Sequence, residues 1–142
     1  MAEPLPSWRR VLVVVAHPDD ESFGLGALVD GFVTGGAEVT VLCLTRGESS
    51  TLGDDVPDLS AVRAEELAAA AAALGVSRTV LRAETGGGFA GYPRAELVAV
   101  SVDRTGQLDA VHRHTTQAVP GSVLWRRLEL LGDVEHVRWL AR

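Results

Sequence analysis

The sequence predicts an α/β fold, a Rossmann-like parallel sheet with flanking helices. Apolar strand-like runs and helical patterns alternate in the order β-α-β-α-β over residues 10–82, as in parallel sheets with helical crossovers. The first two strand-like runs are continuous in Val and Leu, which is typical of strands buried on both faces of such a sheet. Together these features predict right-handed β-α-β units that place consecutive strands in one sheet.

Local signals define five elements in the first half of the chain. In order, we expect a strand at 10–16, a helix at 20–33, a strand at 37–45, a helix at 61–74 and a strand at 78–82. Ser60 is the expected cap of the second helix. Glycines follow both helices, Gly35 and Gly36 after the first and Gly75 after the second, and they predict where the helices end.

The second half begins with a glycine-rich stretch and is less regular. We expect a strand at 97–102, a helix at 103–116, a helix at 123–131 and a strand at 135–140. Asp103 and Ser122 are the expected helix caps. Leu108, Val111 and Thr115 are the expected inner face of the longer helix. Since no repeat or linker divides the chain, we expect a single domain over 1–142.

Composition and charge argue against several classes of protein. A net charge of −6 disfavours a non-specific nucleic-acid surface, which needs a basic field. The single cysteine, Cys43, excludes a disulfide framework. The first residues have no apolar stretch typical of a signal peptide, and the longest apolar runs are too short to span a bilayer. We therefore expect a cytoplasmic protein with no nucleic-acid partner and no membrane span, while the oligomeric state stays open.

An acidic cluster with one imidazole, "HPDDE", follows the first predicted strand directly. Ligands bind at the carboxyl ends of strands in parallel sheets, and His with carboxylates suits zinc. One of Asp19 and Asp20 could bind the metal while the other takes a proton from water. Alternatively, both carboxylates cap the following helix and His17 is an ordinary turn residue. A dinucleotide site is disfavoured, because this turn is acidic and lacks G-x-G-x-x-G.

Several motifs together resemble the PIG-L/LmbE-like family of zinc-dependent N-deacetylases. The most specific is "AHPDDE" after a Val-rich strand. The others occur in the family's order and spacing: "LTRGE" at 44–48, "VRAEEL" at 62–67, "ALGV" at 73–76 and "LDAVHRHTTQ" at 108–117. The resemblance implies a hydrolase that removes the acetyl group from an N-acetylglucosamine-type amino sugar or a related small amide.

The resemblance also implies a set of site residues. His17 and Asp20 would be ligands of one Zn²⁺ per chain, and Asp19 would be the general base. Glu48 and Arg63 would lie toward the sugar, although Arg63 could instead form a surface ion pair with Glu66, one helical turn away.

The late histidines depart from the family pattern, in which a later "HPDH"-like motif supplies the third zinc ligand. This chain has no such motif, so a middle segment near 82–84 is expected to be missing and the fold to be reduced. His114 corresponds to the family's H-x-[ST]-Q histidine, which braces the structure or rims the site. His112 and His114 point to nearly opposite sides of a helix and cannot chelate one metal together. His112 is expected to be a partly buried packing residue, and His136 to lie on the surface.

These departures keep a second function open. The chain could be a non-catalytic remnant of the family, with at most weak metal or sugar binding. An active deacetylase predicts tightly held zinc and turnover of an N-acetyl sugar, whereas a remnant predicts neither.

Overall fold

A three-stranded parallel sheet forms the centre of the protein. The computed structural model describes residues 3–47, 50, 52, 55–82, 98–130 and 132–137, without the side chains of Arg127 and His136. The strands are β1 (Arg10–Val15), β2 (Glu38–Cys43) and β3 (Arg78–Leu81), in the order β1-β2-β3. Their register places Arg10 opposite Glu38, and Thr40 opposite Arg78. This arrangement confirms the predicted parallel α/β fold.

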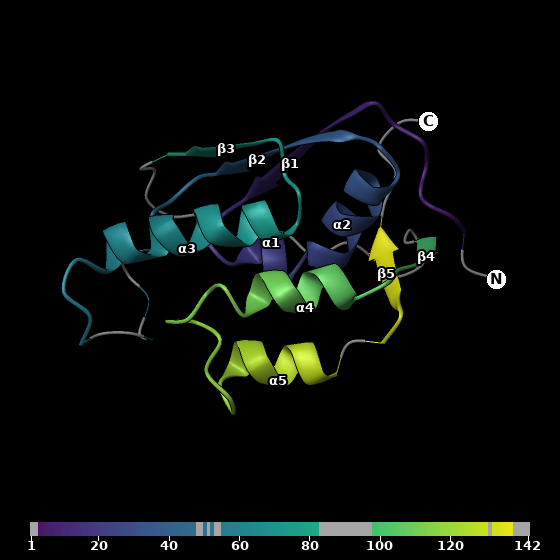
Figure 1. Ribbon diagram of the computed structural model, residues 1–142. Helices are drawn as coiled ribbons and strands as arrows, with labels where there is room; N and C mark the ends of the chain where they lie inside the picture. The colour runs from purple at the N-terminus through teal and green to yellow at the C-terminus, as the bar shows by residue number, and fades with distance from the viewer. Residues whose placement is uncertain are drawn as a thin grey trace.

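Helices cover one side of this sheet (Figure 1). The helices are α1 (Asp20–Phe23), α2 (Gly26–Thr34), α3 (Leu59–Ala73), α4 (Thr105–Val111) and α5 (Val123–Glu129). Helix α4 packs against α1, α2 and α3, and α5 lies beyond α4. Strands β4 (Val98–Ser101) and β5 (Val134–Val137) form a separate antiparallel pair. None of the described helices is long and apolar enough to cross a membrane.

The helix expected at 20–33 is two helices, separated at Gly24 and Leu25. The backbone N–H groups of both residues donate to Asp20 O, at 2.9 and 3.1 Å, and this closes the short α1. Gly24 favours such a break because glycine is a poor helix former and a Cβ there would lie 2.9 Å from Asp20 O. The break allows α1 and α2 to take different directions after the acidic turn.

The expected helix caps are only partly correct. Asp58, not Ser60, caps α3, because its carboxylate accepts from Ala61 N at 3.3 Å. Ser122 accepts as expected, from Trp125 N at 3.2 Å. Asp103 accepts from Thr105 N at 2.9 Å, but the cap position of α4 is Arg104, which makes no side-chain capping bond.

The helix expected at 103–116 ends early, at Val111. The next residues form turns, in which Arg113 N donates to Ala110 O and His114 N to Val111 O, and Thr115 and Thr116 then bond to Glu66 on α3. The inner face also differs from the expectation, since Leu108 and Thr115 are exposed. The buried side chains of α4 are instead Gln107, Ala110 and Val111.

The core lies between the sheet and the helices, so the sheet is buried on one face only. Residues on the covered face are buried, namely Val13, Val15, Val39, Val41 and Cys43. On the opposite face, Leu12 is 63% exposed and Val14 is 46% exposed. The expectation that the first strand is buried on both faces is therefore wrong. A continuous apolar run looks the same in a sequence whether one face or both are covered.

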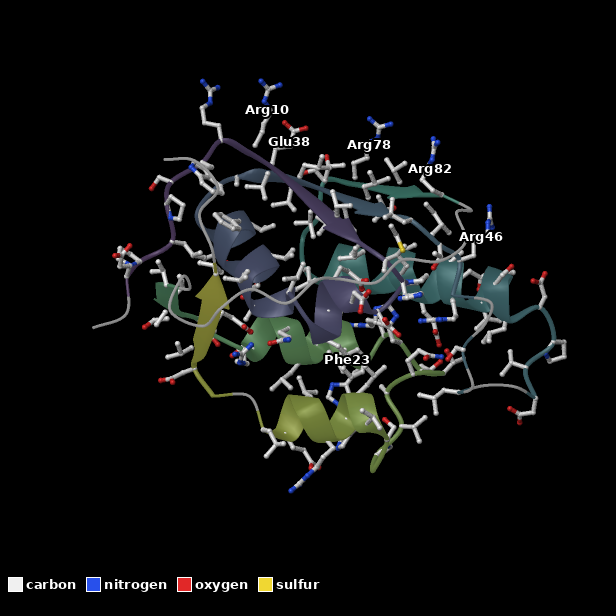
Figure 2. All side chains as sticks on the ribbon, turned by 180° about the vertical axis from the view of Figure 1, so that it is seen from behind. Arg10, Phe23, Glu38, Arg46, Arg78 and Arg82 are labelled. Carbon is white, nitrogen blue, oxygen red and sulfur yellow. The ribbon has the colours of Figure 1, made fainter. Side chains whose placement is uncertain are left out.

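The open face carries a rim of charge around this apolar surface. Arg10, Glu38, Arg78 and Arg82 point away from the helices (Figure 2). Leu12 and Val14 lie in the same strand as Arg10 and are on the same face by strand alternation. An exposed apolar area on a sheet favours association or binding of apolar molecules.

Replacing the exposed apolar side chains of β1 should reduce this apolar surface at little cost. For Leu12→Thr with Val14→Thr, we expect weaker binding of a fluorescent apolar dye and a free energy of unfolding lowered by less than about 1 kcal/mol, since threonine suits strands. The matched control is Val41→Thr on the covered face, which is fully buried. This variant should lower the free energy of unfolding by about 1–3 kcal/mol, because the new hydroxyl is buried at a position where the wild type has no polar side chain. Equal costs on the two faces would contradict the one-sided core.

Candidate metal and catalytic site

The acidic turn lies at the carboxyl end of β1 and is held in an unusual backbone conformation. Asp19 has φ 143° and ψ −30°, a region that non-glycine residues rarely adopt and that costs about 1–3 kcal/mol. Asp19 O accepts from Ser22 N at 2.9 Å and from Phe23 N at 2.8 Å. The Asp19 side chain makes no capping bond to α1. The alternative in which Asp19 merely caps the helix is therefore wrong.

His17 and Asp20 come together on the outer side of the turn. His17 Nδ1 lies 3.6 Å from Asp20 Oδ2, and the side chains are 50% and 40% exposed. Two donors on one tetrahedral zinc, bound at about 2.0–2.1 Å, lie about 3.3–3.4 Å apart. The pair therefore fits two corners of a zinc site. The residues that the structure describes contain no group of three His, Cys, Asp or Glu side chains that could hold a metal.

Asp19 lies next to this pair in sequence, but its carboxylate bonds to a different side chain. Its Oδ2 accepts from Arg63 Nη2 at 2.6 Å, and both side chains are almost fully buried. Burial raises the pKa of Asp19 from 3.8 to about 7, and the Arg63 guanidinium opposes part of that rise. The two neighbouring aspartates thus have different environments, one half-exposed beside His17 and one buried against a cation.

Arg63 connects three segments behind the turn. Besides Asp19, it donates from Nη2 to Pro18 O at 2.5 Å and from Nη1 to Gly47 O at 2.7 Å. Gly47 has φ 67°, and a Cβ there would overlap the guanidinium, so this close approach requires glycine. The expected alternative of a surface ion pair with Glu66 is wrong, because Arg63 is buried. The expected substrate contact Glu48 lies outside the described residues.

Two fully buried side chains lie behind the turn, Glu21 and His114. His114 Nε2 lies 2.6 Å from Glu21 Oε1. This burial favours the bracing role expected for His114 over a position on the solvent-facing rim. Glu21 was not singled out as a site residue by sequence reasoning. The signal that could have found it is its place in "HPDDE", since a buried acid needs partners from elsewhere in the chain.

The other late histidines do not join the site. His112 is exposed, and its ring meets Trp125 edge-on at 5.9 Å between centroids, so the expected partial burial is wrong. His112 Nδ1 lies 2.7 Å from Leu108 O. The side chain of His136 lies outside the description.

Comparisons with known proteins identify the family of this chain. A family model described as PIG-L, GlcNAc-PI de-N-acetylase, matches residues 12–130. Two curated relatives are both named 1D-myo-inositol 2-acetamido-2-deoxy-alpha-D-glucopyranoside deacetylase. The one from Nakamurella multipartita is 43% identical over 100 residues, covering 61% of this chain and 34% of that protein. The one from Kineococcus radiotolerans is 37% identical over 142 residues, covering 93% of this chain and 38% of that protein.

A solved structure extends the likeness to the fold. The N,N'-diacetylchitobiose deacetylase from Pyrococcus horikoshii, complexed with an inhibitor, superposes with a TM-score of 0.51 at 29% identity. The match covers 55% of this chain and 30% of that one. The chain spans about a third of the length of the curated relatives it matches. The motif resemblance is confirmed, and the chain belongs to the PIG-L, GlcNAc-PI de-N-acetylase, family.

Proposed function

We propose that this chain carries the catalytic turn of a zinc-dependent hydrolase that removes the acetyl group from an N-acetylglucosamine-type amino sugar or a related small amide. The observation that carries the proposal is the arrangement of the turn. His17 and Asp20 converge on one side, while the adjacent Asp19 is buried and oriented by Arg63. The names of the bacterial relatives make an inositol-linked N-acetylglucosamine the first substrate to test.

The residues of the turn take distinct roles in this proposal. His17 Nδ1 and Asp20 Oδ2 would hold the zinc ion, which when bound supplies Lewis-acid polarisation of the amide carbonyl. Asp19 Oδ1 would take the proton of the attacking water and deliver it to the departing amine. This oxygen is available because Arg63 occupies Oδ2, and Oδ1 accepts no hydrogen bond from the part of the chain that is described.

The remaining expected residues support the turn in different ways. Arg63 orients Asp19 in this proposal, since its Nη atoms donate to Asp19 and to two backbone carbonyls, while its Nε is buried without a partner in the described part of the chain. A contact between Arg63 and the sugar stays part of the proposal. Glu48, which directly follows Gly47, stays a proposed substrate contact. The proposed substrate is a small amino sugar, and the proposed metal content is one ion per chain.

Zinc binding by the purified chain tests the proposal directly. We expect His17→Ala to weaken zinc binding by at least about 100-fold, because loss of a ligand should exceed the 10–100-fold cost of losing an outer partner. The measurement is equilibrium dialysis with metal analysis. His112→Ala is the matched control, since His112 is exposed beside Trp125, outside the turn, and should bind zinc as the wild type does.

Three outcomes separate the possibilities. Equal zinc affinity in wild type and His17→Ala would contradict a site at this turn. Zinc binding that depends on His17 but comes without hydrolysis of any N-acetyl sugar would favour a non-catalytic member of the family. Zinc binding with turnover supports the proposed hydrolase.

A further inference from the structure

The Glu21 carboxyl is one of the fully buried polar groups next to the turn. It lies on α1, immediately after the two aspartates of the turn. A buried carboxyl is costly unless hydrogen bonds replace its water. Here three groups do so: Asp19 N at 2.9 Å on Oε2, with Ser22 Oγ at 2.7 Å and His114 Nε2 at 2.6 Å on Oε1.

These bonds place Glu21 between the turn and the second half of the chain. Oε2 holds the backbone of Asp19, the residue with the unfavourable φ. Oε1 holds His114, which is 93 residues away in sequence and follows α4. One side chain therefore couples the backbone of the turn to a distant segment.

Asp19 is consequently held at two points. Glu21 binds its backbone N–H, and Arg63 binds its carboxylate. A strained conformation persists only where the surroundings over-determine it. The direction of the Asp19 side chain, and the placing of His17 and Asp20 around it, depend on this backbone conformation.

A second contact ties the same two parts together. Gln107 on α4 is fully buried, and its Nε2 donates to Ser22 O at 2.7 Å and to Phe23 O at 3.2 Å. This contact docks α4 on α1, which places His114 within reach of Glu21. His114 Nδ1 is buried and has no partner among the described residues. Within the described residues, the hydrogen bonds of the ring are therefore made through Nε2, and the Phe23 ring lies beside it at 6.5 Å between centroids.

We propose that Glu21 and His114 form a positioning pair that holds the Asp19 backbone in its active conformation and thereby sets the geometry of the metal ligands. The inference rests on the proposed function, because it assumes that His17 and Asp20 hold the metal. Neither Glu21 nor His114 touches metal or substrate. They act through the turn, in the way that outer hydrogen-bond partners orient metal ligands.

Glu21→Gln tests the pair, with Glu66→Gln as the matched control. The glutamine amide replaces the carboxylate by a neutral group, whose hydrogen bonds are weaker than those of a carboxylate. With its oxygen toward Asp19 N, its nitrogen faces Ser22 Oγ and His114 Nε2, which accept from it only after the hydroxyl and the ring rearrange their protons. We expect zinc affinity to fall about 10–100-fold in Glu21→Gln. Glu66 is also buried and also binds the segment after α4, through Thr115 and Thr116, but does not contact the turn. Glu66→Gln should leave zinc affinity within about 3-fold, the usual scatter of such measurements between sites.

A second readout does not need metal. Hydrogen exchange of the Asp19 amide in the metal-free protein reports the bond to Glu21 Oε2 directly. We expect exchange of this amide to be about 10-fold or more faster in Glu21→Gln, with the core amides of Val39 and Val41 unchanged. A general loosening of the fold would instead speed exchange at all three positions.

His114→Gln and a double variant test whether the two residues act together. The zinc affinity of the double variant Glu21→Gln with His114→Gln should equal that of whichever single variant binds zinc less tightly. The two losses should not add, because each change alone already breaks the contact between Glu21 and His114. Ser22→Ala removes one donor to Glu21 Oε1 while keeping the carboxylate, so it should show a smaller loss in the same direction. It also serves if Glu21→Gln does not fold.

The outcomes separate this inference from the proposed function. If the wild type binds no zinc, the proposed function fails. Hydrogen exchange of the Asp19 amide in Glu21→Gln then still tests whether Glu21 holds the turn. Unchanged zinc affinity and unchanged Asp19 exchange in Glu21→Gln, or in Ser22→Ala, would overturn the positioning pair. Equal losses of zinc affinity in Glu21→Gln and Glu66→Gln would also overturn it.

Discussion

Asp19→Asn is expected to reduce amide hydrolysis by about 10²–10⁴-fold, the usual contribution of a general base. Asparagine has nearly the same shape and can still accept from Arg63, but it cannot take a proton from the attacking water. Zinc binding by His17 and Asp20 should persist, because both donors belong to other side chains. The measurement is release of acetate from an N-acetylglucosaminyl substrate, together with zinc content.

Asp109→Asn is the matched control for activity. Asp109 is an exposed acid on α4 whose nearest cation is Arg113, at 3.2 Å. Turnover of this variant should equal that of the wild type. Residual activity of Asp19→Asn within about 3-fold of the wild type would contradict the assignment of Asp19 as the base, since it is far below the effect of losing such a group.

The same variant has a predicted pH signature in the metal-free protein. Burial raises the pKa of Asp19 to about 7, so the folded state binds a proton that the unfolded state has already released. The stability due to Asp19 is therefore fully present below pH 3.8 and is lost as the pH rises to about 7. Relative to Asp19→Asn, the wild type should lose up to about 4 kcal/mol across this window. Urea unfolding of both proteins checks this, and parallel stability curves would contradict the raised pKa.

Arg63→Met is expected to lower the free energy of unfolding by about 3–5 kcal/mol near neutral pH, because it breaks a buried ion pair and forces Asp19 either to take up a proton or to stay charged without its cation. The carbonyls of Pro18 and Gly47 lose their donor as well. Arg63 lowers the pKa of Asp19, so its removal should raise that pKa further. Asp19 would then be protonated at neutral pH, and hydrolysis should fall together with stability.

Arg113→Met is the control for Arg63→Met. Arg113 is half-exposed and pairs with Asp109 one helical turn away, an arrangement worth about 0.3–0.5 kcal/mol. Chemical unfolding near neutral pH measures both variants. If Arg63→Met lowers the free energy of unfolding no more than Arg113→Met does, the contact between Arg63 and Asp19 does not stabilise the protein as a buried ion pair. At about pH 5 the cost of Arg63→Met should shrink, because a neutral Asp19 needs no cation.

Much of the fold could be predicted because its signals are local. The strands at the start of the chain, the helix over 59–73 and the helix that Ser122 caps all follow from short patterns. The exceptions have physical reasons that lie outside such patterns. One expected helix is divided at Gly24, and another ends at Val111, before a segment whose Thr115 and Thr116 bond to the distant Glu66.

The candidate site divides in the same way. His17 and Asp20 are three residues apart, so one tight turn is enough to bring them within 3.6 Å, and the motif predicted them. Arg63 and Asp19 are 44 residues apart, and Glu21 and His114 are 93 apart. No periodicity relates residues at such separations, so sequence reasoning expected Arg63 near the sugar and left Glu21 without a role.

By itself, the sequence determined the family, the parallel order of the first three strands and the residues of the acidic turn, because each depends on contiguous residues. Tertiary structure alone decided that Asp19 is buried against Arg63 while Asp20 faces outward beside His17. It also decided that one face of the sheet stays open. Both follow from which distant segments pack against the turn and the sheet. The burial of a side chain depends on those neighbours, and two adjacent aspartates with the same intrinsic chemistry thereby acquire different properties.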